Sequence, residues 1–311
     1  MAEQNPVRVT GTSLGKRYGN GTWGLHDLDL DVRGGRFLAV IGHNGAGKST
    51  LLNMLGGVLR PTKGTLDIQP RGLRASWSPQ RVLVDWSLTV RQNVELSALL
   101  TGHRHAGEIR PAVDEVLDLL DLTKVAGEEA ENLSGGQLQR VQIARALACD
   151  SELYVMDEPA AGLDPAAADL VMNHLRGKAE RGAAVVVSSH DLDAVERTAD
   201  HLLLLDSGRA VADLPVAEFV ASTGGRMAVT VTLEAPAERE PAVPESWTVA
   251  LAEDRSSLEF DVPISVAVGE VLAAVPAGSP VADLDVRRQS LRDVYLARHA
   301  KPSPLTVGEE S

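Results

Sequence analysis

The fold of this chain is decided by the stretch Gly42-His43-Asn44-Gly45-Ala46-Gly47-Lys48-Ser49-Thr50. It matches the pattern G-x-x-x-x-G-K-[ST]. Residues 36–41 before it, which are apolar from Phe37 onward, predict a β-strand, and apolar residues at helical spacing over 51–59 predict a helix after it. A glycine-rich loop between a strand and a helix N-terminus forms a cradle for phosphate, because backbone N–H groups and the helix dipole point at the anion. Lys48 can reach the β- and γ-phosphates, and the hydroxyl of Ser49 can bind magnesium.

A second apolar strand ends in two acidic residues. Residues 153–156 predict a buried strand, and Asp157 and Glu158 follow it directly. The end of this strand brings both carboxylates to the same sheet edge as the phosphate loop. Asp157 can hold magnesium there, and Glu158 can polarise a water molecule aimed at the γ-phosphate. An acidic pair after a strand is by itself more often a solvated loop, but the phosphate loop favours the functional interpretation.

Strand and helix patterns alternate along the first two thirds of the chain, which predicts a largely parallel sheet. The helical spacing of apolar residues between Ile109 and Leu120 indicates a helical insert at about 88–133. We expect further strands at 27–32, 64–68, 185–187 and 201–206, and further helices at 137–148 and from Pro165.

Beyond residue 225 the pattern changes to that of a small α+β domain. Strands are expected at 229–233, 247–251, 258–262 and 281–286, with a short helix before the last strand. A final helix opens at Ser290, where Ser290 and Asp293 resemble a capping box. The predicted domains are therefore 1–225 and 226–300, followed by a disordered tail at 301–311.

Length and composition exclude several classes of protein. A chain of 311 residues suggests about two domains, and its net charge of -13 disfavours broad attachment to nucleic acid or anionic lipid. The single cysteine, Cys149, excludes a disulfide scaffold and fits the cytosol. The segment 262–282 carries Glu270, prolines and glycines, so no membrane span is expected. The N-terminus lacks the features of a signal peptide.

A second anion-binding motif lies at residues 133–140, Leu-Ser-Gly-Gly-Gln-Leu-Gln-Arg, where a helix opens. A chain with the phosphate loop, then Leu-Ser-Gly-Gly-Gln, then a strand ending in Asp-Glu, then a histidine after a further strand resembles the ATP-binding cassette (ABC) ATPases. The resemblance covers about residues 7–215. It implies an α/β fold, a P-loop NTPase cassette with a mixed sheet core and a helical insert, with the small α+β domain appended.

The resemblance implies ATP and Mg²⁺ as cofactors and assigns roles to residues. The implied catalytic residues are Glu158, His190, Lys48 and Gln80. The implied metal ligands are Ser49, Gln80 and Asp157. The implied nucleotide contacts are Tyr18, Gly42, Asn44, Gly45, Ala46, Gly47, Lys48, Ser49, Thr50, Ser134, Gly135, Gly136, Gln137 and Asp164.

Some of these positions carry further interpretation. Tyr18 corresponds to the aromatic residue that stacks on adenine, with an ordinary edge-strand tyrosine as the alternative. Gln80 falls in the loop that touches the membrane partner, and His190 matches the switch histidine that contacts the γ-phosphate. His43 stands where the family commonly has proline, and we expect it to be a surface histidine without a role.

Other reactive side chains are expected to be structural. Ser189, His190 and Asp191 do not form a triad, because neighbours on an extended chain point to opposite sides. His103, His105 and His174 lack ligand spacing, and we expect solvated helix or loop positions for them. Cys149 is expected to be a packing residue.

The resemblance also implies partners. The family's Leu-Ser-Gly-Gly-Gln motif closes over ATP held by another subunit, so the partner is a second cassette, either a second copy or a close relative. Integral membrane permease subunits would hold the chain at the cytoplasmic face, and no nucleic acid is expected. Residues 283–300 resemble the end of the drug- and antibiotic-export type, with Arg292 and Tyr295 as departures. We therefore expect the motor of an exporter, with an importer ATPase or a soluble ABC ATPase of translation or DNA repair as alternatives.

Overall fold

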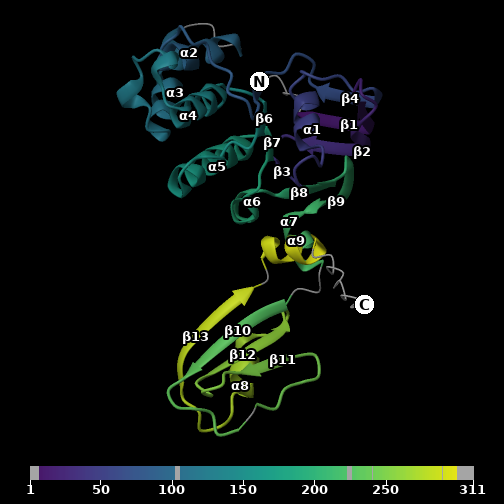
Figure 1. Cartoon of the computed structure of the whole chain (residues 1–311), viewed down its shortest axis with the longest axis vertical. Helices are drawn as coiled ribbons and strands as arrows, with labels where there is room; N and C mark the ends of the chain where they lie inside the picture. The colour runs from purple at the N-terminus through teal and green to yellow at the C-terminus, as the bar shows by residue number, and fades with distance from the viewer. Residues whose placement is uncertain (1–6, 102–105, 223–225, 240, 289, 300–311) are drawn as a thin grey trace, which may run out of the picture. The chain divides into compact units, whose positions relative to one another are not determined.

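The computed structural model describes residues 7–101, 106–222, 226–239, 241–288 and 290–299 (Figure 1). Contacts divide the chain into two compact units between Pro215 and Val216. The sequence interpretation drew this boundary at residue 225. The difference arises because the short helix after Pro215 packs on the last helix of the second unit. The expected tail at 301–311 and the residues His103 and His105 lie outside the described part of the chain.

The first unit contains two β-sheets. Their strands are β1 (Arg8–Arg17), β2 (Trp23–Arg33), β3 (Phe37–Ile41), β4 (Lys63–Gln69), β5 (Ala75–Ser78), β6 (Leu153–Asp157), β7 (Ala184–Ser188), β8 (His201–Asp206) and β9 (Arg209–Pro215). The larger sheet has the order β5-β6-β7-β3-β8-β9, in which β9 alone runs antiparallel to its neighbour. The smaller sheet is antiparallel, with the order β2-β1-β4. The expected α/β fold with a mixed sheet is confirmed.

The helices of the first unit surround the larger sheet. They are α1 (Lys48–Leu55), α2 (Val90–Leu100), α3 (Ala106–Leu119), α4 (Gly135–Leu147), α5 (Pro165–Glu180) and α6 (Leu192–Thr198), with 3-10 turns at Thr123–Val125 and Ala130–Asn132. Helices α2 and α3 lie in the insert expected at about 88–133 and pack with α4, whereas α1 lies beside the smaller sheet (Figure 1).

Both faces of the larger sheet are buried. Strands β3, β6 and β7 have no exposed residue, so their sequences are almost continuously apolar. Their side chains nevertheless alternate between two cores. In β6, Tyr154 and Met156 pack with the insert helices and α5, whereas Leu153 and Val155 pack with α1 and the smaller sheet. The α1 side of the sheet is therefore rigidly supported where the phosphate loop begins.

Several local features differ from the sequence prediction, which also named no strand at the position of β1 and no helix at that of α6. Helix α1 ends at Leu55 rather than continuing to residue 59, because Gly56 caps it and Gly57 has a φ of 73°. The strands β5 and β9 were not predicted. β5 has only 4 residues, and β9 has polar and partly exposed positions, so neither shows a clear apolar pattern.

The second unit is an antiparallel sheet with three helices among its described residues. Its elements are α7 (Val216–Ala221), β10 (Arg226–Leu233), β11 (Thr248–Leu251), β12 (Ser257–Pro263), α8 (Val268–Ala274), β13 (Val281–Arg288) and α9 (Leu291–His299). The strand order is β11-β12-β10-β13. Alternate residues of β10 and β12 are buried and pack against Val271 of α8. The backbone N–H of Asp293 donates to Ser290 Oγ at 3.2 Å, as the predicted capping box requires.

Among the residues that the structure describes, no helix has both the length and the apolar character needed to cross a bilayer.

Candidate functional site

The phosphate loop occupies residues 42–47, between the end of β3 and the first residue of α1. Gly42 and Gly47 have φ values of 150° and 109°. A Cβ on Gly42 would lie 2.3 Å from Leu205 O, and one on Gly47 would lie 2.5 Å from Gly24 O. Only glycine fits at these two positions, so the loop can fold tightly over the end of the sheet.

Lys48 is directed back into the loop that precedes it. It is 7% exposed, and its Nζ donates to Gly42 O at 2.7 Å and to His43 O at 3.2 Å. Burial lowers the pKa of Lys48, whereas the carboxylates of Glu158 and Asp157 oppose that shift. The ammonium group is thus held at the loop by carbonyl oxygens, in place to interact with a phosphate group.

The two acidic residues at the end of β6, where Asp157 is the last residue of the strand and Glu158 follows it, are held by a serine that the sequence interpretation did not single out. Ser188 Oγ donates to Asp157 Oδ1 at 2.6 Å and accepts from the backbone N–H of Glu158 at 2.9 Å. Ser188 ends β7, and Asp157 pairs with it in the parallel register of the two strands. The only sign of Ser188 in the sequence was its position at the end of β7, the strand beside the one that carries the acidic residues.

Glu158 and His190 face each other. Glu158 is 8% exposed, has a φ of 54° and lies with Oε1 3.0 Å from Nε2 of His190. The backbone N–H of His190 donates to Glu158 Oε2 at 3.3 Å. Burial raises the pKa of the Glu158 carboxyl, although His190 and Lys48 act in the opposite direction. A buried carboxylate in a left-handed backbone conformation is costly, which is typical of functional positions.

An open cleft of about 480 Å³ brings most of the predicted residues together. Its lining comprises Tyr18, Thr22, Trp23, Gly24, Asn44, Gly45, Gly47, Lys48, Ser49, Thr50, Gln80, Asp157, Glu158 and His190. Gly42 and Ala46 lie behind this lining as buried loop residues. The predicted residues Ser134, Gly135, Gly136, Gln137 and Asp164 do not line the cleft.

Two aromatic side chains flank the open end of the cleft. Tyr18, directly after β1, is 40% exposed, and its hydroxyl lies 3.0 Å from Thr50 Oγ1. Trp23, the first residue of β2, is 39% exposed. Sequence reasoning missed Trp23, although a tryptophan in a polar, glycine-rich run is an available signal. Both side chains line the cleft and are partly exposed, so either is a candidate for stacking on a base.

Comparison with known proteins places the site in a family. The profile of the ABC transporter family matches residues 25–161. The daunorubicin resistance ATP-binding protein DrrA3 of Streptomyces coeruleorubidus is 30% identical over 301 residues, which cover 93% of this chain and 94% of that protein. The chain belongs to the ABC transporter family.

Within this family the chain is an ATP-hydrolysing, ATP-binding subunit. It is also similar to the zinc import ATP-binding protein ZnuC of Paramagnetospirillum magneticum, with 35% identity over 216 residues, 67% of this chain and 80% of that protein. Among solved structures, a dimeric post-hydrolysis state of the ATP-binding cassette MJ0796 with ADP and Pi has a TM-score of 0.62 and 28% identity. The match covers 67% of this chain and 98% of the MJ0796 chain.

The Leu-Ser-Gly-Gly-Gln motif of this ABC subunit opens helix α4. Ser134 is the N-cap, and its Oγ accepts from the backbone N–H of Gln137 at 3.3 Å. The side chain of Gln137 accepts in return from the backbone N–H of Ser134 at 2.9 Å. Gly135 and Gly136 are exposed, with open space where a Cβ would lie. The helix end is thus built as a flat, accessible surface, and Gln137 serves as its cap.

Asp164 is fixed near this helix rather than at the cleft. It is the N-cap of α5, and Arg140 Nη2 of α4 lies 3.4 Å from its Oδ2. The bond from the backbone N–H of Ala167 holds the pKa of Asp164 below its ordinary value.

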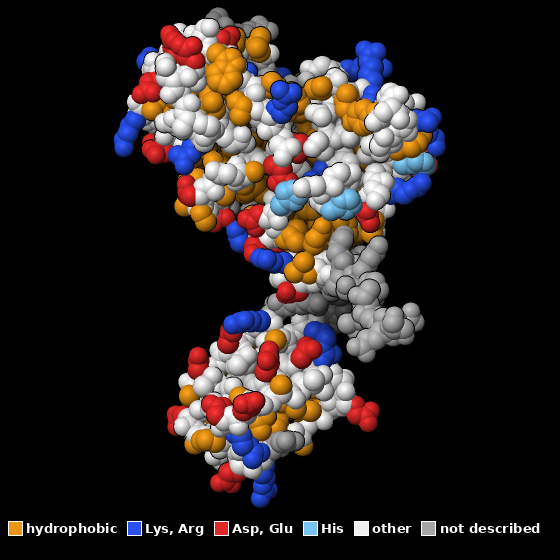
Figure 2. All heavy atoms as spheres, in the orientation of Figure 1, with side chains coloured by type: hydrophobic (Ala, Val, Ile, Leu, Met, Phe, Trp, Pro, Cys, Tyr) orange, Lys and Arg blue, Asp and Glu red, His pale blue; other side chains and the backbone are white. Residues whose placement is uncertain are grey.

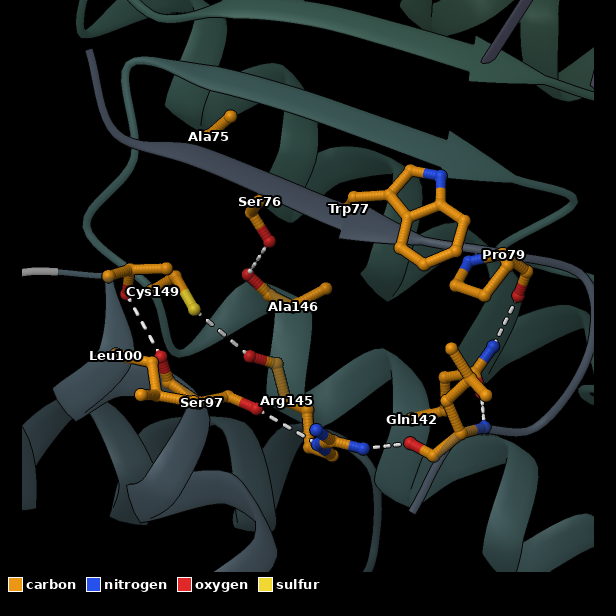
Figure 3. Close-up of a pocket in the computed structure, with 12 residues that line it drawn as sticks. Ala75, Ser76, Trp77, Pro79, Ser97, Leu100, Gln142, Arg145, Ala146 and Cys149 are labelled. Atoms are coloured by element: carbon orange, nitrogen blue, oxygen red, sulfur yellow. Dashed lines mark hydrogen bonds between the residues drawn. The ribbon is translucent and has the colours of Figure 1, made fainter. Parts of the chain in front are cut away.

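A second hollow, of about 310 Å³, lies between β5, α2 and α4 (Figure 3). Arg145 of α4 crosses it and donates from Nε to Ser97 Oγ at 2.9 Å. Burial lowers the pKa of Arg145. Leu83 and Leu100 at the hollow are 50% and 77% exposed, and Figure 2 shows apolar side chains at the surface in the region of α2, α3 and α4.

Two side chains expected to be structural can also be placed. Cys149 is buried and lines the hollow, so the packing interpretation is confirmed. His174 of α5 is not solvated as expected, because its side chain is 10% exposed and burial lowers its pKa to about 4. The cause is its packing beside α3, where Glu115 Oε1 lies 3.7 Å from its Nδ1.

Proposed function

We propose that this subunit is the ATP-hydrolysing motor of an exporter and works as a pair of cassettes on separate membrane subunits. The observation that carries the proposal is the separation of two anion-binding features. The phosphate loop lines the cleft, whereas Ser134, Gly135 and Gly136 at the start of α4 do not. A second cassette can supply the missing surface, and the dimeric MJ0796 cassette supports such a pairing.

The cleft offers a ligand set that fits Mg²⁺. Ser49, Gln80 and Asp157 line it together and present hydroxyl, amide and carboxylate oxygens, which are the ligands this ion prefers. The bond from Ser188 fixes the Asp157 carboxylate in position. Among the described residues no group of three His, Cys, Asp or Glu side chains lies close enough to hold a metal by itself. Held by these residues, the ion would neutralise negative charge on the phosphates during phosphoryl transfer.

The protein's own groups then position ATP and water. The loop amides and Lys48 bind the phosphates, and the ring of Tyr18 stacks on the base. Glu158, buried and adjacent to the cleft, accepts a proton from the attacking water. His190, 3.0 Å from Glu158, orients that carboxylate and contacts the γ-phosphate. Fixed charges placed around the transferred group provide most of the rate enhancement in this kind of reaction.

The hollow between β5, α2 and α4 supports the proposal that the chain binds a membrane subunit. It lies beside Pro79, which precedes Gln80 of the nucleotide cleft, so one loop borders both features. Its exposed leucines and the partly buried Arg145 suit a short amphipathic segment with a carboxylate. Insertion of such a segment would couple movement of Gln80 to movement of the membrane subunit.

The direction of transport is supported by the second unit. A match that covers 93% of the chain must include most of residues 216–311, and it is to a daunorubicin resistance protein. The match to the zinc importer covers only 67% of the chain. The similarity of the second unit to that resistance protein therefore supports the exporter proposal.

The test uses Glu158→Gln, trapped with Mg-ATP in membranes of the source cell and purified by an affinity tag. Mass spectrometry should find a multi-spanning membrane protein in about equal amount. Lys48→Ala is the control, because it cannot retain nucleotide and should not give the trapped complex. Ribosomal or DNA-bound partners without a membrane protein would overturn the transport proposal.

The direction of transport needs a separate measurement. Metabolites are compared in the cells and in the medium of strains with and without the gene. An exporter predicts that the cargo rises inside the cells of the deletion strain and falls in the medium. The opposite change would support an importer.

A further inference from the structure

His43 makes two hydrogen bonds whose acceptors carry no hydrogen. Its Nδ1 lies 2.7 Å from Asn44 O, and its Nε2 lies 3.0 Å from Asp206 Oδ1. A carbonyl and a carboxylate oxygen can only accept, so both ring nitrogens must donate. A neutral imidazole has a single N–H, and this geometry therefore favours the doubly protonated, cationic form of His43.

The charges around His43 agree with this state. Asp206, from the end of β8, and the Asn44 carbonyl both raise the pKa of His43 above its ordinary value. Lys48, from the start of α1, acts in the opposite direction but less strongly. The His43 side chain is 48% exposed, so it exchanges protons freely with solvent.

The pair His43–Asp206 joins the phosphate loop to the turn between β8 and β9. The same turn is joined to the loop a second time, because the backbone N–H of Gly208 donates to Ala46 O at 2.9 Å. His43 also presents its backbone oxygen to Lys48 Nζ at 3.2 Å. The position of His43 therefore bears on both the shape of the loop and the place of its lysine.

We propose that His43 is a positioning residue whose positive charge, held by Asp206, shapes the phosphate loop and makes nucleotide affinity depend on pH. The proposal rests on the nucleotide site described above and adds a regulatory group to it. Below its pKa, His43 keeps both hydrogen bonds and adds a positive charge to the phosphate loop. As pH rises through that pKa, one bond and the charge are lost, so affinity falls.

The protonation state is tested without nucleotide. Two-bond ¹H–¹⁵N NMR of the full chain with ¹⁵N-labelled histidine, assigned with His43→Gln, should show that the pKa of His43 lies above the ordinary value of about 6.5 and that both ring nitrogens are protonated below that pKa. Asp206→Asn should lower that pKa. A His43 that titrates at or below about 6.5 would overturn the proposal.

The functional consequence is tested with ADP, which is not hydrolysed. The ratio of wild-type to His43→Gln affinity cancels the pH effects that both proteins share, including the protonation of ADP. We expect a ratio of about two to five at about pH 6 that falls toward one at about pH 8.5, the size of a partly exposed charge interaction.

The matched control is His201→Gln. His201 forms the same kind of pair, with Nε2 2.7 Å from Asp213 Oδ1, but it lies at the opposite end of β8. The ratio of wild-type to His201→Gln affinity for ADP should stay near one at every pH. A flat ratio for His43→Gln would overturn the role of His43 while leaving nucleotide binding intact. A wild-type chain that binds no ADP at any pH would overturn the nucleotide site and this proposal together.

Discussion

Ser188 Oγ donates to Asp157 Oδ1 at 2.6 Å, which locks the last residue of β6 to the last residue of β7. The same hydroxyl accepts from the backbone N–H of Glu158. One small side chain thus fixes the carboxylate of Asp157 and the backbone of Glu158. The catalytic role proposed for Glu158 depends on this fixed position.

The first prediction concerns Glu158. Replacement by glutamine removes the proton acceptor but keeps the shape of the cleft, so kcat should fall about 10²- to 10⁴-fold. ADP and ATP affinity should change little. The matched control is Glu180→Gln, an exposed carboxylate paired with Arg176 at 3.1 Å, which should leave kcat unchanged. Steady-state ATPase assays check this, and near wild-type turnover in Glu158→Gln would remove Glu158 from the proposed role.

The second prediction concerns pH. Burial raises the pKa of Glu158, so this carboxyl is protonated, and unable to accept a proton, at pH values where an exposed glutamate is ionised. The kcat for ATP should therefore fall with decreasing pH, with a midpoint above the ordinary glutamate value of about 4.3. Saturating ATP and circular dichroism at each pH separate this loss from weak binding and unfolding. A constant kcat down to about pH 4.3 would argue against it.

The third prediction separates the two aromatic residues at the cleft. Tyr18→Ala should weaken ATP binding about tenfold, because stacking on a base contributes about 1–3 kcal/mol. Tyr18→Phe removes only the bond to Thr50, at 3.0 Å, and should bind almost as the wild type does. Trp23→Ala is measured beside them by calorimetry. If Trp23→Ala alone weakens binding, the base stacks on Trp23 and Tyr18 is the ordinary strand-edge tyrosine.

The fourth prediction concerns the start of β4. Gly64 has a φ of 77°, and a Cβ there would lie 2.3 Å from both Thr12 O and Ser13 O. Gly72 has a φ of 79° but open space around it. Gly72→Ala should therefore cost about 1–2 kcal/mol of backbone strain alone. Gly64→Ala should cost about 2 kcal/mol more, since backbone atoms must move. Denaturant unfolding monitored by tryptophan fluorescence checks the difference, and equal losses would contradict the clash.

Much of the cleft follows from local sequence. The phosphate loop and the acids after β6 are contiguous motifs on strands of almost pure apolar residues, and parallel strands deliver their ends to one sheet edge. The parts that sequence did not reveal depend on contacts between distant segments. Ser188 has an effect only because β7 lies beside β6, and Trp23 reaches the cleft only because β2 folds back on β1.

The same reason explains the errors. His174 has an ordinary helical context, and only the packing of α3 beside α5 removes it from solvent. The boundary between the units was placed too late because α7 is a short helix of 6 residues. Its contact with α9, which assigns it to the second unit, is visible only in the folded chain. Helix α1 was predicted too long because apolar spacing continued past the paired glycines that end it.

The position of Ser134 away from the cleft has a genetic consequence. If two copies close on each other, each complete centre takes its phosphate loop from one copy and its serine from the other. A cell that makes one copy with a damaged loop and one with a damaged Ser134 would assemble mixed pairs in which both lesions fall in the same centre. The other centre in such a pair would be undamaged, so two inactive alleles would restore partial activity to each other.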